Sequence, residues 1–377
     1  MMDNISIKMT AGAYLMESHR YTELTATQVR VFNDAAQALE GMAIASAALK
    51  LFSGWMYHKK VGGREYLFHA TDRHNNGRSL GARSPDTEVQ LEKWLAEKES
   101  VHQAYARAGV ALEDQRRLAK AMRLGRFPKE GAKLFRYLEK AGVAENFVII
   151  GTNALYTYES MADVRFVSEL TATKDCDLLW GSRKKIVFVE QNAGDKPGMM
   201  SLLKKVDKTF TKNTERTFQA INADGFAIEI LRPGEPKEPS LIVDGDGIVP
   251  IHLKGLEYLF SAPLVTATVI ADDGYPLKLR VPDPAVFALH KLWVADQPDR
   301  SPGKAMRDRE QAAAVAQLIH CRLPQYSFDI NRVQDFAPEL LDYLDTLASA
   351  SASEHLPAHS PSCPSASPKG RYATSAD

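Results

Sequence analysis

The stretch FVIIGTNALYTYESMADVRFVSELTATKDCDLLW, residues 147–180, contains the pattern that decides the fold. It begins with an apolar run that ends at a Gly-Thr pair, and it closes with DCDLLW, which carries two aspartates on alternate positions. Short apolar runs bounded by glycine predict β-strands. Because residues two apart on a strand point to the same face, Asp175 and Asp177 are expected to project together, with Cys176 on the opposite face. Packing alone does not require this arrangement.

The Gly-Thr pair predicts a turn that binds an anion. Gly151 lets the backbone approach a ligand, and Thr152 begins a helix that is predicted to run through Leu155. Backbone N–H groups at the start of a helix, together with a hydroxyl, form a ready site for phosphate. We include the next residue, Asn153, in this predicted site. The alternative is that the pair only caps the helix.

The paired aspartates predict a metal site. Adjacent carboxylates repel and raise each other's pKa, and oxygen ligands of this kind suit Mg²⁺ or Mn²⁺. The predicted strand FAIEIL, residues 226–231, supplies Glu229 as a third candidate, because an acidic residue in an apolar strand is costly unless it is exposed, paired or metal-bound. If this strand pairs beside the DCDLLW strand, three carboxylates converge. The alternative is that Asp175 and Asp177 merely end a strand.

At these residues the sequence resembles the nucleotidyltransferase superfamily with the DNA polymerase β-like fold. The superfamily pattern is a strand, a Gly-Ser turn that opens a helix, a strand carrying DxD or DxE, and a later strand with a third acidic residue. The matching residues are Gly151-Thr152, Asp175-Cys176-Asp177 and Glu229. GTNALYTYES, TKDCDLLW and the later PDPAVFALHKLWVA look like a bacterial family related to the minimal nucleotidyltransferases of toxin–antitoxin and abortive-infection systems. The resemblance covers residues 129–320.

The resemblance implies both a fold and an activity. We expect an α+β, polymerase β-like core, in which helices flank a small mixed sheet. The implied activity is transfer of a nucleoside monophosphate from an NTP such as ATP to an acceptor hydroxyl on RNA, protein or a small molecule, by a two-metal mechanism. Catalysis and metal binding would fall to Asp175, Asp177 and Glu229, with Glu229 also a candidate base. Thr152 replaces the commoner serine but keeps the hydroxyl, and Glu229 replaces the commoner aspartate.

The triphosphate requires cations, which the C-terminal helical region supplies. Lys291 is the first choice, because related families place a lysine on a helix after the catalytic sheet. A second group follows along the chain, with Asp308 nearby: Arg300, Lys304, Arg307 and Arg309. The alternative for any one of these residues is an ordinary charged amphipathic helix. His290, beside Lys291, is interpreted as a packed core histidine.

Changes of pattern divide the chain into four parts. Residues 1–125 form a helical module with a small antiparallel sheet, 126–250 the nucleotidyltransferase core, 251–346 a hairpin and helices that complete the nucleotide site, and 347–377 a disordered tail. The tail is rich in Ser, Pro and Ala and almost lacks large apolar residues.

Further elements follow from periodicity and turn signals. Helices are predicted over 26–51, from Ser84-Pro85 to about Leu124 with a break near Gly109, through Leu134 to a glycine cap at Gly142, and over 282–295 and 304–320. Strands are predicted over 185–189 and over 217–221, the latter joined by an Asn222–Gly225 turn to 226–231. A hairpin is predicted over 264–281.

Two basic regions raise the alternative of nucleic-acid binding. One is a cluster that we interpret mainly as a solvated helix face: Arg116, Arg117, Lys120, Arg123, Arg126 and Lys129. The other is the N-terminal sheet, which mixes basic and aromatic residues as nucleic-acid readers do: Arg64, Tyr66, Phe68, His69, Arg73 and Arg78. The alternative functions are therefore a nucleic-acid-binding regulator and a catalytically silent nucleotide-binding member of a defence or toxin–antitoxin pair with a partner protein.

Composition restricts the compartment and the partners. The 47 Lys and Arg residues equal the 47 Asp and Glu residues, so no overall charge favours nucleic acid or membrane. The 3 cysteines lie far apart without CxxC spacing, which argues against disulfides and structural zinc. No signal-like apolar segment and no run of about 18 apolar residues occurs. We therefore expect a cytoplasmic protein that neither enters nor crosses a membrane.

Overall fold

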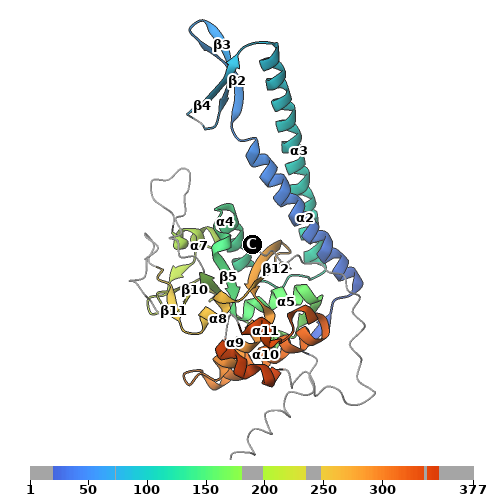
Figure 1. Ribbon diagram of the computed structural model, residues 1–377, viewed down its shortest axis with the longest axis vertical. Coiled ribbons are helices and arrows are strands. Elements are labelled where there is room, and N and C mark those ends of the chain that lie inside the picture. Colours follow the sequence, from blue (N-terminus) through green and yellow to red (C-terminus); the bar gives the residue numbers. More distant parts are fainter. Residues whose placement is uncertain (1–19, 73, 181–197, 235–247, 335–337, 348–377) are drawn as a thin grey trace, which may run out of the picture. The chain divides into compact units, whose positions relative to one another are not determined.

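The computed structural model describes residues 20–72, 74–180, 198–234, 248–334 and 338–347. The chain divides into two compact units (Figure 1). The core unit comprises Met1–Ala26, Arg126–Ala271 and Leu277–Asp377, and the helical unit comprises Thr27–Gly125 and Asp272–Pro276. The strand predicted over 185–189, and the predicted tail from residue 348 onward, lie outside the described residues. The four-part division of the chain stays a prediction.

The core unit is built on a six-stranded mixed sheet. Its strands are β5 (Phe147–Ile150), β7 (Asp175–Trp180), β8 (Thr211–Lys212), β9 (Gln219–Ile221), β10 (Ala227–Pro233) and β11 (Ile251–Leu253). They lie in the order β5-β7-β10-β9-β8, with β11 also paired to β10. Strand β7 is antiparallel to β5 and parallel to β10. The predicted strands at these places are confirmed, with β9 starting two residues late and β10 ending two residues late.

Helices pack around this sheet, as expected for an α+β protein. They are α4 (Lys129–Lys140), α5 (Leu155–Ala162), α6 (Ser168–Thr171), α7 (Met199–Val206), α8 (Leu256–Ser261), α9 (Pro284–Ala295), α10 (Pro302–Arg322) and α11 (Ile330–Val333). Short 3₁₀ turns are η1 (Ala144–Asn146), η2 (Gly151–Ala154), η3 (Pro324–Tyr326) and η4 (Pro338–Tyr343). The expected helices over 282–295 and 304–320 are α9 and α10. Helix α4 ends before Gly142, whose φ of 69° confirms the predicted glycine cap.

Two small pairs of strands complete the core unit. Strand β1 (Tyr21–Glu23) pairs antiparallel with β6 (Val164–Phe166), and β12 (Leu264–Ile270) forms the predicted hairpin with β13 (Pro276–Pro282). The Asn222–Gly225 turn between β9 and β10 is also confirmed, because the Gly225 N–H donates to the Asn222 carbonyl at 3.0 Å.

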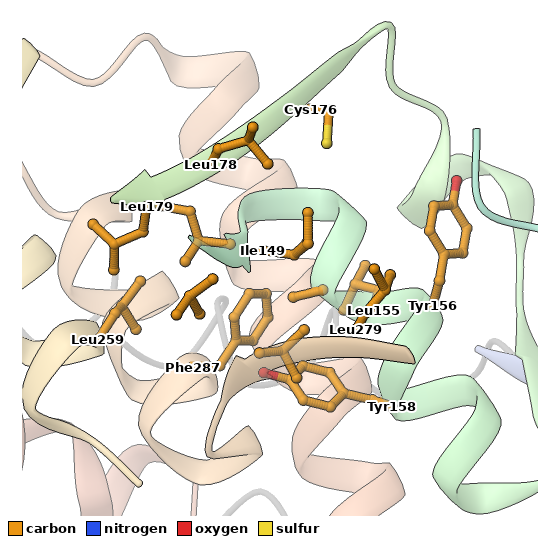
Figure 2. Packing of buried hydrophobic residues seen from close by; sticks show 14 of the residues in the cluster. Ile149, Leu155, Tyr156, Tyr158, Cys176, Leu178, Leu179, Leu259, Leu279 and Phe287 are labelled. Atoms are coloured by element: carbon orange, nitrogen blue, oxygen red, sulfur yellow. The ribbon is translucent and has the colours of Figure 1, made fainter. Parts of the chain in front are cut away.

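The core sits where the sheet meets α5 and α9 (Figure 2). Ile149 and Leu178 of the sheet, Tyr158 of α5 and Phe287 of α9 all have 1% or less of their surface exposed. The rings of Tyr158 and Phe287 lie edge to face with centroids 5.3 Å apart, and the Tyr158 hydroxyl donates to the Pro282 carbonyl at 2.9 Å. Burying one such side chain contributes about 1.5–3 kcal/mol, so this packing fixes α5 and α9 on the sheet that carries the acidic residues.

The helical unit consists of two long helices and a small sheet. Its elements are α2 (Ala26–Leu51), α3 (Pro85–Ala121), β2 (Trp55–Val61), β3 (Arg64–Ala70) and β4 (Gly77–Ala82). The three strands are antiparallel in the order β2-β3-β4, as predicted. Ser84 caps α3 through a capping box, in which its side chain accepts from the Thr87 N–H and the Thr87 side chain accepts from the Ser84 N–H. No helix in the described part of the chain has the length and apolarity that a membrane span needs.

The break predicted near Gly109 is wrong, because α3 runs without interruption from Pro85 to Ala121. A Cβ placed on Gly109 would meet no atom within 4 Å, so this glycine neither turns the chain nor admits a neighbour. A single glycine inside a helix costs about 0.5–1 kcal/mol relative to alanine, which a helix of this length tolerates.

Candidate active site

The acidic residues predicted from alternation lie side by side on β7 and β10. The parallel register pairs Asp177 with Glu229 and Cys176 with Ile228. Paired residues share a face of the sheet, and Cys176 is completely buried while Asp177 and Glu229 are only partly buried. Asp177 and Glu229 therefore lie on one face of the sheet and Cys176 on the other, as expected. Asp175 precedes Asp177 by two positions and projects on the same face.

The glycine turn lies directly against this acidic pair. Gly151 has a φ of 62°, in the left-handed region that favours glycine. A Cβ at this position would lie 2.1 Å from Oδ2 of Asp177, which is far inside contact distance. A side chain at position 151 would therefore displace the Asp177 carboxylate, and glycine at a positive φ lets the backbone between β5 and α5 approach it. The turn itself is the 3₁₀ segment η2, and the regular helix begins at Leu155 rather than at Thr152.

The acidic cluster is electrostatically strained. The pKa of Asp177 is raised to about 8, first by burial and then by the charges of Asp175 and Glu229, while Lys291 and Arg300 oppose the rise.

Glu229 is the second carboxyl of the cluster with a raised pKa. Burial raises the pKa of Glu229, a hydrogen bond from Gln219 lowers it, and the charge of Asp175 raises it. The nearby positive charges of Arg216 and Lys304 lower it. Because Asp177 and Glu229 are both pushed toward the neutral form, the cluster calls for a positive ligand.

Neighbouring side chains hold the acidic residues in place. Nε2 of Gln219, on β9, donates to Oε1 of Glu229 at 2.6 Å, and Nδ2 of Asn213 donates to Oε1 of Gln219 at 2.6 Å. The Thr173 hydroxyl donates to Oδ1 of Asp175. Sequence reasoning missed Gln219, although its place across a predicted hairpin from Glu229 was a usable signal.

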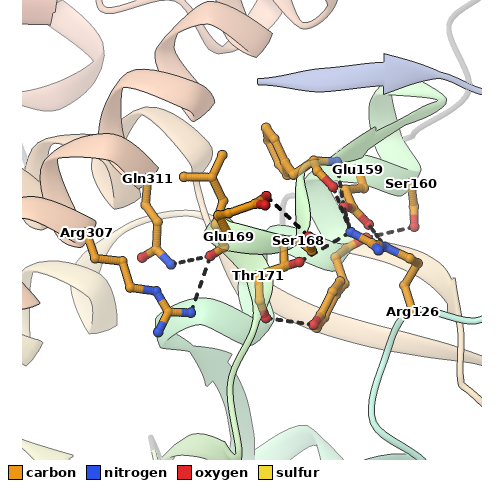
Figure 3. Close-up of polar contacts among 11 residues, drawn as sticks. Arg126, Glu159, Ser160, Ser168, Glu169, Thr171, Arg307 and Gln311 are labelled. Atoms are coloured by element: carbon orange, nitrogen blue, oxygen red, sulfur yellow. Dashed lines mark hydrogen bonds and ion pairs between the residues drawn. The ribbon is translucent and has the colours of Figure 1, made fainter. Parts of the chain in front are cut away.

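The predicted phosphate turn is held by two amides. Nδ2 of the buried Asn153 donates to the backbone carbonyl of Asp175 at 2.6 Å, so Asn153 ties the turn to β7. Nε2 of Gln311, on α10, donates to the Thr152 hydroxyl at 3.2 Å and to the Leu170 carbonyl at 2.7 Å. Figure 3 shows Gln311 beside Arg307, both pointing from α10 toward α6, where both donate to the Leu170 carbonyl. No sequence pattern linked Gln311 to Thr152.

The predicted cations meet at one buried carboxylate. Asp308, which is 2% exposed, accepts from Nζ of Lys291 at 2.7 Å and from Nε of Arg300 at 2.7 Å. One negative charge therefore holds two positive charges, which leaves a net positive group that acts on Asp177. The sequence indicated the three residues but not that Asp308 joins the other two.

The remaining predicted cations are placed differently. Lys304 is exposed and acts on Glu229 through its charge. Arg307 donates to the carbonyls of Leu170 and Ala172, just before β7. Arg309 points to another partner, because its Nη2 lies 2.6 Å from Oδ1 of Asp296.

The packed role expected for His290 is confirmed. Its side chain is buried, and its ring is stacked on that of Trp293 at 5.8 Å. Burial lowers the pKa of His290 to about 3, with a further contribution from the charge of Lys291. This histidine is therefore neutral and belongs to the core.

The basic cluster between α3 and α4 is less solvated than expected. In the helical unit, Arg116 and Arg117 both pair with Glu113 on the same helix. In the core unit, Nη2 of Arg126 lies 2.7 Å from Oε1 of Glu159, and Glu159 is almost completely buried (Figure 3). The solvated interpretation is wrong for Arg126, because a buried carboxylate on α5 requires a charge partner.

The carboxylates supply the ligand chemistry that a divalent cation needs. Asp175, Asp177 and Glu229 offer oxygen donors only, which suits Mg²⁺ or Mn²⁺, and their mutual repulsion would be relieved by an ion. Within the described residues, no group of three or more His, Cys, Asp or Glu side chains already surrounds an ion position. The residues fit the ion by type and by register, and their side chains are not arranged around one.

The core unit thus combines a mixed sheet, a glycine turn against a carboxylate, and two paired acidic residues on neighbouring strands. A model of the family described as Nucleotidyltransferase matches residues 129–333, and the chain belongs to this family. It is thus a transferase of nucleotidyl groups. No curated protein and no solved structure shows significant similarity to the chain.

Proposed function

We propose that the core unit is a metal-dependent nucleotidyltransferase that transfers a nucleoside monophosphate from an NTP to an acceptor hydroxyl. The observation that supports this most directly is the register of β7 and β10, which sets Asp177 beside Glu229, with the Gly151 backbone against Asp177. Here the turn must approach the carboxylate, as a site for metal and phosphate together requires.

Asp175, Asp177 and Glu229 would hold Mg²⁺ or Mn²⁺. Bound divalent ions would supply charge neutralisation for the triphosphate and would lower the pKa of the attacking hydroxyl. Glu229 presents one oxygen to Gln219 and keeps Oε2 for other ligands. Where Asp175 and Asp177 hold the ion, Oε2 of Glu229 would accept the hydroxyl proton.

The proposed reaction exchanges one bond at the α-phosphorus for another. The acceptor oxygen forms a bond to the α-phosphorus, the bond from the α-phosphorus to the bridging oxygen breaks, and pyrophosphate leaves with that bond's electron pair. The hydroxyl proton passes to Glu229. Positioning and charge stabilisation supply the catalysis, as in other phosphoryl transfers.

The cations of α9 and α10 would bind the triphosphate. Asp308 fixes Lys291 and Arg300 in one place, and the net positive charge of this group remains available to an anion. Lys304 is exposed near Glu229 and can reach a phosphate without breaking an ion pair that the structure shows in its described residues. Thr152, whose hydroxyl accepts from Gln311, keeps its own hydroxyl proton for a phosphate oxygen.

The test combines ion binding with transfer. Purified full chain is titrated with Mn²⁺ by electron paramagnetic resonance, and each labelled NTP is then supplied with Mg²⁺ or Mn²⁺ together with RNA, protein and cell extract as acceptors. The variant is Asp177→Asn, and the matched control is Asp224→Asn, which changes an exposed aspartate at the β9–β10 turn.

We expect Asp177→Asn to lose Mn²⁺ binding and transfer by at least about 100-fold, because a positioned charge in a phosphoryl-transfer site contributes that much or more. Asp224→Asn should match the unchanged protein. Binding of Mn²⁺ and NTP that is equal in all three proteins would overturn the proposed site, and binding without transfer to any acceptor would favour a catalytically silent nucleotide-binding protein.

A further inference from the structure

The sheet of the helical unit has two faces of different character. Its inner face packs on α3: Leu67 is completely buried, and the ring of His69 lies 5.8 Å from that of Trp94 in an edge-to-face contact. Residues alternate between faces along a strand, so the positions before and after Leu67 and His69 belong to the opposite, outer face.

The outer face gathers aromatic rings from β2 and β3. The antiparallel register sets Tyr57 opposite Phe68, with ring centroids 5.9 Å apart, and Lys59 opposite Tyr66. Trp55 lies on the same face at the end of β2 and is 38% exposed. The rings of Tyr57, Tyr66 and Phe68 are partly exposed.

The third strand leaves these rings accessible. Opposite Phe68 and Tyr66, β4 places Ser79 and Ala82, and opposite Ala70 it places Gly77. Small side chains on the neighbouring strand do not overlay an aromatic ring. A planar ligand can therefore reach the rings from this side.

The outer face is also positively charged. Nζ of Lys59 lies 4.9 Å from the Phe68 ring centroid, and Arg64 is exposed at the turn between β2 and β3. The strands β2, β3 and β4 contain a single acidic residue, Glu65, which points to the inner face and is bound to Arg83 at 2.6 Å. Rings and cations thus share a face on which these strands place no carboxylate.

We propose that the outer face binds single-stranded RNA. Bases stack on exposed aromatic rings and backbone phosphates pair with basic side chains, which is how sheet surfaces bind single strands. The hydroxyls of Tyr57, Tyr66 and Ser79 give the face donors for 2′-hydroxyl groups. A double helix is unsuitable, because its bases are already stacked and cannot reach the rings.

This surface lies in the helical unit, and its RNA binding does not depend on the proposed chemistry of the core unit. The two proposals fail separately: Asp177→Asn should abolish transfer and leave RNA binding unchanged. Loss of RNA binding in that variant would contradict the independence of the surface.

The test uses the full chain and a short labelled oligouridine, with binding followed by fluorescence anisotropy. Tyr57→Leu with Tyr66→Leu removes two rings but keeps apolar bulk, and should weaken binding at least about 10-fold. Lys59→Gln with Arg64→Gln keeps the rings, and should flatten the slope of log K against log salt by about 1.4, because each phosphate contact to a single strand contributes about 0.7.

The matched control is Lys60→Gln with Arg78→Gln, which removes the same charge from the opposite face of the same strands. It should bind RNA within about 3-fold of the unchanged protein, since distant charges act only through screened interactions. If this control loses as much affinity as Lys59→Gln with Arg64→Gln, binding is diffuse electrostatic attraction and the proposal is wrong.

Intrinsic fluorescence gives a second readout. Oligouridine should quench the tryptophan emission of the unchanged protein, and Trp55→Phe should remove that quenching while it retains binding. Absence of binding, equal affinity for duplex RNA, or tighter binding of single-stranded DNA would each overturn the proposal. Circular dichroism checks that each variant is folded, and the charge variants decide the question if the ring variants are not.

Discussion

The two units of this chain use their side chains in opposite ways. In the core unit, the buried cluster extends through the sheet and α5, α9 and α10, and the charged groups that matter are partly or wholly buried. In the helical unit, the 37 residues of α3 include three buried residues, Thr87, Leu112 and Ala119. The core unit therefore encloses its charged groups, whereas most side chains of α3 in the helical unit are exposed or partly exposed.

The two units should differ most in the stability that is lost when a side chain is truncated. Phe287→Ala should lower the free energy of unfolding of the core unit by about 3–5 kcal/mol, because the truncated ring leaves a cavity among fully buried neighbours. Val110→Ala, at an exposed position of α3, should change the free energy of unfolding of the helical unit by less than about 0.5 kcal/mol. Urea unfolding measures both. A comparable loss for the two variants would contradict the contrast between the units.

The second difference concerns ion pairs. Asp308→Ala should cost about 3 kcal/mol or more, because it leaves Lys291 and Arg300 without the buried carboxylate that joins them. The exposed pair Lys93–Glu97, with 74% and 51% of the two side chains exposed, provides the control. Glu97→Ala should cost about 0.5 kcal/mol or less. Thermal unfolding at low and high salt distinguishes the buried ion pairs of Asp308 from the exposed Lys93–Glu97 pair. If the stability lost in Asp308→Ala depends on salt, the ion pairs of Asp308 are not shielded from solvent.

Replacing a glycine by alanine should reduce activity at one position in the core unit and increase stability at one position in the helical unit. Gly151→Ala forces a Cβ onto Oδ2 of Asp177 at a positive φ, so we expect transfer activity to fall by at least about 100-fold. That loss would correspond to about 2.7 kcal/mol of transition-state stabilisation. Gly109→Ala meets no atom and should stabilise α3 by about 0.5–1 kcal/mol. Equal activity of Gly151→Ala and the unchanged protein would remove the turn from the site.

The stability of the core unit should also depend on pH. His290 has a pKa of about 3 in the folded chain, below the ordinary value of about 6.5. The unfolded chain therefore binds the proton first, and stability that is complete above about pH 6.5 is lost as the pH falls toward 3.

Between pH 7 and 5 this loss should be about 2 kcal/mol. His290→Phe should flatten that part of the curve relative to the unchanged protein. An identical pH profile for the two proteins would show that the buried imidazole does not control it. Chemical unfolding at several pH values is the measurement.

Alternation and glycine placement predicted much of the fold and part of the candidate site. The strand over 175–180 was predictable because it is short, apolar and bounded by polar residues, and the shared face of Asp175 and Asp177 follows from its period. Gly151 was predictable as a point of close approach because only glycine adopts its backbone angle without cost.

The rest required tertiary contacts that no local pattern encodes. Gln311 reaches Thr152 from 159 residues away, and Asp308 joins Lys291 to Arg300 only because α9 packs on α10. Arg126 was misjudged as solvated because its partner, Glu159, is buried on another helix. In the N-terminal sheet, the basic and aromatic residues could be grouped from the sequence. Only the register shows that Arg64, Tyr66 and Phe68 face away from His69 and Arg78, and Arg73 lies outside the described residues.

The core unit is expected to transfer the nucleotidyl group of the NTP to an acceptor. The most direct measurement compares NTP labelled at the α-phosphate with NTP labelled at the γ-phosphate, with Mg²⁺ or Mn²⁺ and a mixture of acceptors. We predict that label from the α-phosphate becomes covalently attached to an acceptor, that pyrophosphate is released in equal amount, and that Asp177→Asn does neither. Attachment of label from the γ-phosphate, or no attachment from either position by folded protein that binds Mn²⁺ and NTP, would contradict the account.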